Sequence, residues 1–143
     1  MSVIAWDGHT LAADCQGTCA GMKNRTHKIK SLPNGDLLAW TGDQDKGLVL
    51  FKWYESGCDP KTWPDFQKGE NWTRLIIIHG GKAFTLEQYP ELIPVLDAFM
   101  AWGAGADFAM GAMAMGADAA KAVKVASRFS VHCGMGIRAF KVK

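Results

Sequence analysis

Short apolar runs joined by glycine-containing turns fill the first 41 residues and constrain the fold more than any other feature. Asp7-Gly8 suits the type I′ turn of a two-residue hairpin, and Pro33-Asn34-Gly35-Asp36 is a second turn sequence. These turns predict two antiparallel hairpins, with residues 15–26 as a loop between them. The expected strands lie at residues 2–6, 9–14, 27–32 and 37–41.

The rest of the chain alternates helical and strand-like segments. Asp43 is a good N-cap for a helix over residues 44–56. The Gly/Ala-rich stretch predicts two more helices, over 104–115 and 118–129, with Asp118 capping the second. Further strands are expected at residues 74–78, 83–86, 94–102 and 134–142, with irregular connections at 58–71 and 88–93. The order predicts one α+β domain over residues 1–143, in which helices cover mostly antiparallel sheets.

Composition excludes several classes of function. The 143 residues carry 16 basic and 14 acidic side chains, and a net charge of +2 is too small to indicate a nucleic-acid or membrane partner. The most apolar window, 98–117, contains Asp107 near its middle, which favours a buried helix over a membrane span. Four cysteines fit no dense disulfide pattern. A cytoplasmic protein with free thiols, without metal or cofactor, is expected.

The start of the chain can carry chemistry by itself. If Met1 is removed, Ser2 bears a hydroxyl and a free α-amine on one residue. A serine hydroxyl is a weak nucleophile until a base takes its proton, and an α-amine with a pKa of about 7.7–8.0 is partly neutral near pH 7. Ser2 is therefore a candidate nucleophile. The alternative is that Ser2 is an ordinary small second residue.

Several segments together resemble a known family. They are Ser2-Val-Ile-Ala, Asp7-Gly8, Leu11-Ala-Ala-Asp14, Lys28, Leu38-Ala-Trp-Thr-Gly42-Asp43 and the Gly/Ala-rich stretch 101–111 with 116–123. In this order they resemble the β-type subunits of proteasomes, which are N-terminal nucleophile (Ntn) hydrolases, and best the short proteasome-like proteins of bacteria and their phages. The resemblance implies a four-layer αββα sandwich, hydrolysis of peptide or amide bonds, and assembly of several copies.

The resemblance also implies site residues. Ser2 falls at the catalytic position, Asp14 and Lys28 at the family's Asp and Lys, and Gly42 at the residue whose N–H forms the oxyanion hole. A lysine ammonium would lower the pKa of the amine, and the carboxylate would hold the lysine in place. Ser130 and Cys133 fall at supporting positions where the family has Asp and Ser or Thr.

Two functions remain open on these residues. The first is a peptide or amide hydrolase that acts on peptide or protein substrates through Ser2. The second is a catalytically weak or inactive protein of the same fold that forms homo-oligomers, because Ser130 brings no charge where the family has a carboxylate. Zinc binding by Cys15, Cys19 and His27 is a weaker alternative, since their spacing fits no standard zinc motif.

Overall fold

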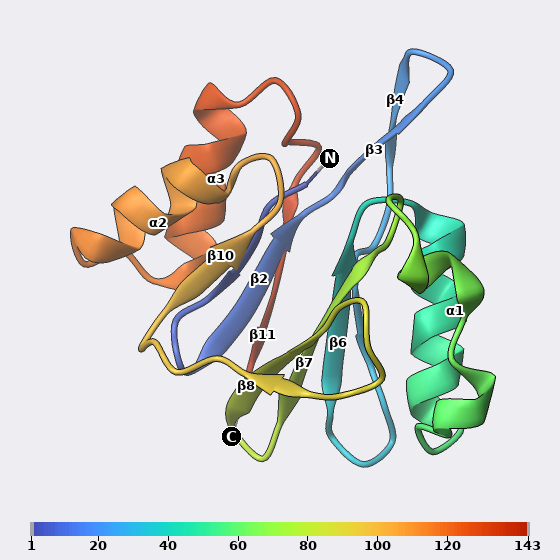
Figure 1. Ribbon diagram of the computed structural model, residues 1–143. Helices are drawn as coiled ribbons and strands as arrows, with labels where there is room; N and C mark the ends of the chain where they lie inside the picture. Colours follow the sequence, from blue (N-terminus) through green and yellow to red (C-terminus); the bar gives the residue numbers. More distant parts are fainter. Residues whose placement is uncertain (1, 143) are drawn as a thin grey trace. The chain divides into compact units, whose positions relative to one another are not determined.

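The computed structural model describes residues 2–142, and its packing separates two compact units. The first unit runs up to Ile29 and resumes at Leu96, and the second is Lys30–Val95. Both units are drawn in Figure 1. Each combines an antiparallel sheet with helices, as the strand and turn sequences predict. No helix among the described residues is long and apolar enough to cross a membrane.

The first unit contains a four-stranded sheet in the order β10-β1-β2-β11, in which all neighbouring strands are antiparallel. The helices α2 and α3 pack against each other and against β1 and β2 of this sheet (Figure 1). The expected first hairpin and both late helices are confirmed, with shorter ends. The expected type I′ turn at Asp7-Gly8 is wrong, because φ is positive at Gly8 but not at Asp7, and Trp6 pairs with Leu11 across a longer connection. The elements are β1 Ile4–Trp6, β2 Thr10–Asp14, β10 Met100–Trp102, α2 Ala106–Ala114, α3 Ala119–Phe129 and β11 Ile137–Lys141.

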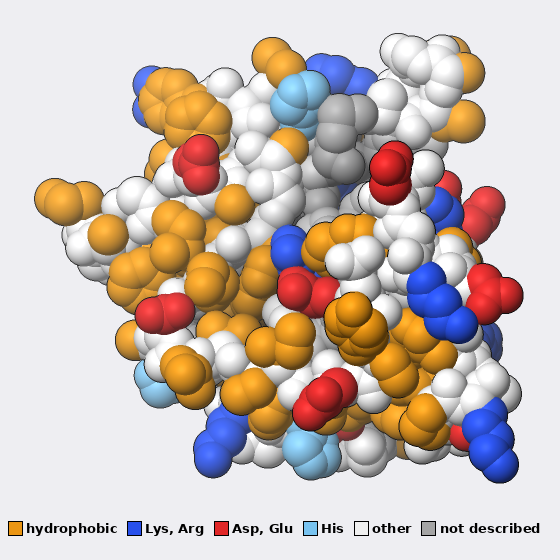
Figure 2. Space-filling model, viewed as in Figure 1, with side chains coloured by type: hydrophobic (Ala, Val, Ile, Leu, Met, Phe, Trp, Pro, Cys, Tyr) orange, Lys and Arg blue, Asp and Glu red, His pale blue; other side chains and the backbone are white. Residues whose placement is uncertain are grey.

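Asp118 caps α3, because its carboxylate accepts a hydrogen bond from the Lys121 amide at 2.8 Å. Several large apolar side chains on or next to these helices are exposed, and Figure 2 shows orange side chains gathered over α2 and α3. Phe108 stacks on Phe129, with ring centroids 6.0 Å apart. Met115 and Val131, which follow α2 and α3, are exposed as well.

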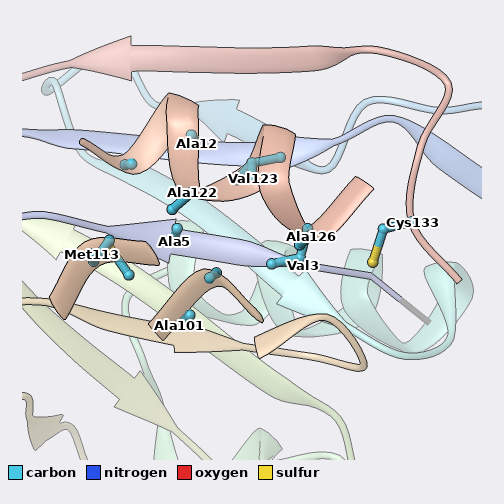
Figure 3. Close-up of a cluster of buried hydrophobic side chains, with 11 residues drawn as sticks. Val3, Ala5, Ala12, Ala101, Met113, Ala122, Val123, Ala126 and Cys133 are labelled. Atoms are coloured by element: carbon cyan, nitrogen blue, oxygen red, sulfur yellow. The ribbon is translucent and has the colours of Figure 1, made fainter. Parts of the chain in front are cut away.

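The core of the first unit is built mainly from small side chains (Figure 3). Val3, directly before β1, and Ala5 and Ala12 on β1 and β2 lie in one cluster with Ala122 and Ala126 of α3. Because alanine keeps the backbones close, helix and sheet can approach each other tightly. This explains why the late helices are rich in Ala and Gly without forming a membrane span. Val123, Met113, Ala101 and Cys133 complete the labelled cluster.

Residues 15–26 differ from the expected loop. They form a second hairpin, β3 Gln16–Cys19 paired with β4 Met22–Arg25. Its two-residue turn is Ala20-Gly21, and both have positive φ (51° and 79°), as in a type I′ turn. β4 is exposed on both faces, so these strands lack the apolar alternation by which a strand is recognised in sequence.

The second unit contains a five-stranded sheet in the order β5-β6-β7-β8-β9, with the helix α1 packed on β6 and β7. The expected strands at 37–41, 74–78 and 83–86 and the helix at 44–56 are confirmed within one or two residues. The segment 94–102, expected as one strand, is divided between β9 and β10, which belong to different sheets. The elements are β5 Ile29–Ser31, β6 Leu37–Thr41, α1 Gln44–Glu55, β7 Arg74–His79, β8 Lys82–Leu86 and β9 Ile93–Pro94.

The connection from α1 to β7 contains two short 3₁₀ turns, Pro60–Thr62 and Asp65–Lys68. Buried Gln67 fixes this connection, because its side-chain amide accepts from the Thr73 amide at 2.6 Å and donates to the carbonyls of Thr73 and Glu87. Trp53 and Trp63 pack edge to face below it, with centroids 4.7 Å apart. The irregular stretch 58–71 is therefore ordered by side chains.

Candidate functional site

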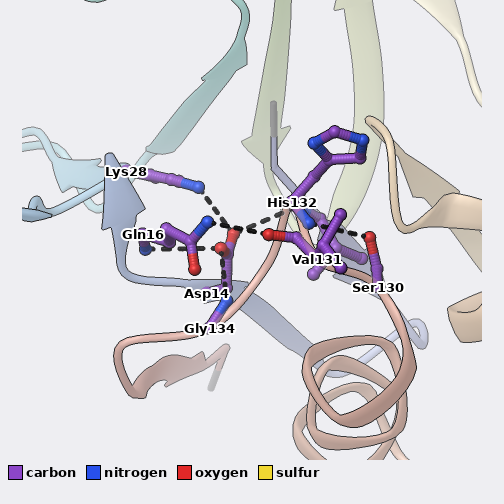
Figure 4. Close-up of polar contacts among 8 residues, drawn as sticks. Asp14, Gln16, Lys28, Ser130, Val131, His132 and Gly134 are labelled. Carbon is purple, nitrogen blue, oxygen red and sulfur yellow. Dashed lines mark hydrogen bonds and ion pairs between the residues drawn. The ribbon is translucent and has the colours of Figure 1, made fainter. Parts of the chain in front are cut away.

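The buried carboxylate of Asp14, at the end of β2, organises the candidate site (Figure 4). One oxygen accepts hydrogen bonds from the Val3 amide at 3.1 Å and the Lys28 ammonium at 2.6 Å. The other accepts from the amides of Gln16 at 3.3 Å and Gly134 at 3.1 Å. Four donors compensate the loss of hydration, so the site is built for a carboxylate anion.

Lys28 lies between β4 and β5, directly before β5. Its side chain is 9% exposed and forms the most deeply buried ion pair among the described residues. The Asp14 oxygen that binds Lys28 also binds the amide of Val3, the residue directly after Ser2. The lysine charge is thereby held next to the peptide group that joins Ser2 and Val3. The two residues expected to pair are thus brought together.

Ser2 precedes β1 and is 3% exposed. Within residues 2–142, its hydroxyl oxygen has no hydrogen-bond partner, although it is buried. A buried hydroxyl without a partner costs free energy and is unusual in folded proteins. The backbone carbonyl of Ser2 is held in place by the Gly105 amide at 3.1 Å. Met1, whose removal the sequence analysis expects, lies outside the described residues.

Two glycines allow the chain after β10 to lie against Ser2. A Cβ built on Gly103 would meet the backbone and hydroxyl of Ser2, and φ of Gly103 is +99°. A Cβ on Gly105 would lie 2.7 Å from the Cys133 sulfur and 3.0 Å from Cβ of Val3. Side chains at either position would therefore displace the candidate nucleophile or its supports. Neither glycine was predicted as a site residue from the sequence.

The loop after α3, residues 130–136, is fastened to the strands that carry the site. The Gln16 side chain donates to the Val131 carbonyl at 3.1 Å, and the Cys15 amide donates to the carbonyls of Gly134 and Gly136. Gln16 is buried, and sequence reasoning missed it because it lies in the unrecognised hairpin. Figure 4 shows Asp14 and Gln16 facing this loop.

Ser130 and Cys133, the expected supporting residues, lie at this loop. The Ser130 hydroxyl accepts from the His132 amide at 3.2 Å and stabilises the turn that ends α3. Cys133 is buried against Gly105, and burial raises the pKa of its thiol, an effect that a hydrogen bond with Ser130 only partly offsets. Cys133 is therefore a neutral thiol near pH 7 and not a reactive thiolate.

Gly42, the expected oxyanion residue, belongs to the second unit, where it follows β6. Its φ is +96°, and it is exposed. A Cβ there would contact only the Thr73 hydroxyl, at 3.8 Å. The role of Gly42 remains a prediction. Among residues 2–142, no group of three or more His, Cys, Asp or Glu side chains could hold a metal ion.

Comparisons with known proteins define the class of fold. No family model and no curated protein sequence matches the chain. Solved structures of proteasome-like Ntn hydrolases do match, over almost the whole chain. The chain therefore has a proteasome-like fold, and the expected α+β class with antiparallel sheets is confirmed.

Three structures illustrate the similarity. BPH of Thiobacillus denitrificans has a TM-score of 0.74 at 17% identity and covers 99% of this chain and 97% of that chain. HslV from Trypanosoma brucei has a TM-score of 0.74 at 16% identity, with coverages of 99% and 98%. The Gly-1 mutant of Anbu from Hyphomicrobium sp. strain MC1 has a TM-score of 0.72 at 12% identity, with coverages of 100% and 82%.

Proposed function

We propose that this protein hydrolyses peptide or amide bonds with Ser2 as an N-terminal nucleophile, after removal of the residue before it. The observation that carries the proposal is the buried, unpartnered hydroxyl of Ser2, whose neighbouring amide shares an Asp14 oxygen with the Lys28 ammonium. The proteasome-like fold supports it, because the fold presents its first residue as a candidate nucleophile. BPH, one of the similar structures, has also been solved in complex with epoxomicin.

In the proposed reaction, the Ser2 oxygen bonds to the substrate carbonyl carbon while its proton passes to the α-amine. The lysine charge next to Ser2 favours the neutral amine and stabilises the developing negative charge. Collapse of the tetrahedral intermediate breaks the carbon–nitrogen bond, and the leaving amine takes that proton. Water, activated by the same α-amine, then hydrolyses the acyl-serine ester and releases a carboxylic acid. Gly42 is proposed as an oxyanion donor.

The proposal is tested by hydrolysis of a panel of fluorogenic peptide amides. We expect Ser2→Ala to reduce hydrolysis at least about 100-fold, as expected for loss of the nucleophile. Ser127→Ala is the matched control, since Ser127 is another hydroxyl whose oxygen is buried without a partner in the described part of the chain. The rate of hydrolysis by the control variant should stay within about twofold of the rate of the natural protein. Activity retained by Ser2→Ala would contradict the proposal.

The second candidate, a non-catalytic protein that assembles with copies of itself, is supported by the exposed apolar side chains of Phe108 on α2, Phe129 on α3 and Met115 at the end of α2. Figure 2 shows orange side chains gathered over these helices. Apolar surface of this kind is typical of protein contacts. Light scattering after size-exclusion chromatography tests it. We expect Phe129→Glu to reduce the assembled mass, with Met22→Glu on the β4 hairpin as the control. A monomer at all concentrations would refute it.

A further inference from the structure

The second unit contains a pocket of about 240 Å³, and none of the candidate site residues lines it. It lies where the start of β7 meets the segment after β8, and all its lining residues come from this one unit. Typical pockets for drug-sized ligands occupy about 300–1,000 Å³, so this one suits a smaller group, such as a single side chain. Trp72, Glu87, Gln88, Tyr89, Glu91 and Ile93 line it.

The walls of the pocket combine aromatic rings with carboxylates. Glu87 is already neutralised, because the Arg74 guanidinium donates to its carboxylate at 2.8 Å. Glu91 has no cation paired with it anywhere in residues 2–142. No basic residue lines the pocket. The pocket therefore keeps one uncompensated negative charge beside an aromatic wall.

The aromatic wall already accepts a cation on one of its rings. The Arg74 guanidinium lies over the Trp72 ring, 5.1 Å from its centroid, within the range of a cation–π interaction. Tyr89, which also lines the pocket, is 78% exposed as a residue, and within the described chain no cation lies over its ring. An exposed aromatic ring beside an unpaired carboxylate is the chemistry by which proteins bind organic ammonium ions.

We propose that this pocket binds an alkylammonium group, with the Tyr89 ring and the Trp72 ring as its walls and Glu91 as its counter-charge. The methylene chain of such a ligand would lie against Ile93, while the ammonium reaches the carboxylate. The same chemistry is offered by a small free amine and by a lysine side chain of another protein. The site requires neither Ser2 nor peptide hydrolysis.

The test is an NMR titration of the folded full-length protein, in which the Trp72 indole N–H is assigned by comparison with Trp72→Phe. We expect n-butylammonium to shift this signal in a saturable way, and neutral n-butanol at equal concentration to leave it nearly unchanged. Raised salt should weaken binding, since the carboxylate is exposed to solvent. The affinities of Nα-acetyl-lysine methylamide and of a lysine-containing peptide are compared with that of n-butylammonium. Tighter binding of the two lysine compounds indicates a protein side chain as the natural source, and tighter binding of n-butylammonium indicates a free amine.

Variants separate the two interactions. Glu91→Gln should weaken n-butylammonium binding about two- to fivefold, the effect of one exposed ion pair. Glu55→Gln is the control, because Glu55 is an exposed acidic residue of the same unit that does not line the pocket. Tyr89→Phe keeps the ring and should retain binding, whereas Tyr89→Ala should weaken it. Equal binding of n-butanol, or equal affinities of the Glu91 and Glu55 variants, would overturn the proposal.

Discussion

Replacement of Asp14 by Asn tests how far the candidate site also stabilises the fold. The substitution keeps the size of the side chain but removes its charge. The Asp14 side chain is 0% exposed and accepts from four donors, one of them the Lys28 ammonium at 2.6 Å. An amide offers one acceptor oxygen, so its NH₂ group would face donors that now bind a carboxylate oxygen.

The expected size of the effect follows from burial. Removing one partner of a buried ion pair costs about 3–5 kcal/mol, because the other charge stays in a poorly hydrated place. Domains of this size have free energies of unfolding of about 5–15 kcal/mol, so Asp14→Asn should remove a large part of the stability. Urea unfolding followed by circular dichroism measures this difference from the shift in midpoint.

Glu87→Gln is the matched comparison for the Asp14 variant. It also removes one carboxylate from an ion pair, with Arg74 at 2.8 Å, but these side chains are 31% and 29% exposed. We expect a loss of about 1 kcal/mol or less there. The double variant Asp14→Asn, Lys28→Met should recover part of the stability, because the unpaired charge is gone. A loss below about 1 kcal/mol for Asp14→Asn, or one equal to that of Glu87→Gln, would refute this reasoning.

Three further substitutions have defined outcomes. From helix propensity alone, Gly47→Ala in α1 would raise the free energy of unfolding by about 1 kcal/mol. Its Cβ would however meet the buried Trp40 ring, so we expect urea unfolding to show a loss of about 1–3 kcal/mol. A gain in stability would refute this packing. Gly103→Ala should lower the thermal midpoint and abolish covalent labelling of Ser2 by a peptide epoxyketone, because the added Cβ would meet Ser2 and φ of this residue is +99°. Unchanged labelling would contradict this. Burial acts to raise the pKa of Asp36. Hydrogen bonds from Tyr54, His79 and Asn34 together outweigh burial, and the pKa of Asp36 lies below the usual 3.8. As the pH falls below about 4, the carboxyl group of Asp36 is protonated in the unfolded state before it is protonated in the folded state. The stability that Asp36 contributes is therefore present above about pH 4 and lost below it. The difference between natural protein and Asp36→Asn should therefore shrink between pH 5 and pH 2, and a constant difference would show that the carboxylate is not involved.

The sequence predicts those parts of the fold in which local signals and packing agree. Asp7-Gly8 marks the first hairpin, and Asp43 and Asp118 mark helix starts, because their side chains cap the first turns. The hairpin at Ala20-Gly21 was missed, because its exposed strands carry no apolar alternation and alanine seldom adopts positive φ. The division of segment 94–102 depends on pairing with distant strands, which no local pattern encodes.

The candidate site was predictable in part, through the family resemblance and not through local patterns. Asp14 ends β2 and Lys28 directly precedes β5, and the structure joins them in a buried ion pair. Gln16 and the amide of Gly134 could not be assigned to the site from sequence, because one lies in the missed hairpin and the other contributes only backbone. Gly103 and Gly105 could have been predicted from the Gly-Ala-Gly sequence, because glycines so close together allow two backbones to approach each other closely.

Mass spectrometry of the purified protein before and after treatment with a peptide epoxyketone tests the central claim most directly. Such a reagent needs a hydroxyl that adds to its ketone and a free amine that opens its epoxide, so one residue must supply both groups. The account predicts a chain that begins at Ser2 and gains the whole mass of the reagent, with the adduct mapped to Ser2. A chain in which a residue still precedes Ser2, or one that begins at Ser2 and stays unmodified, would contradict it.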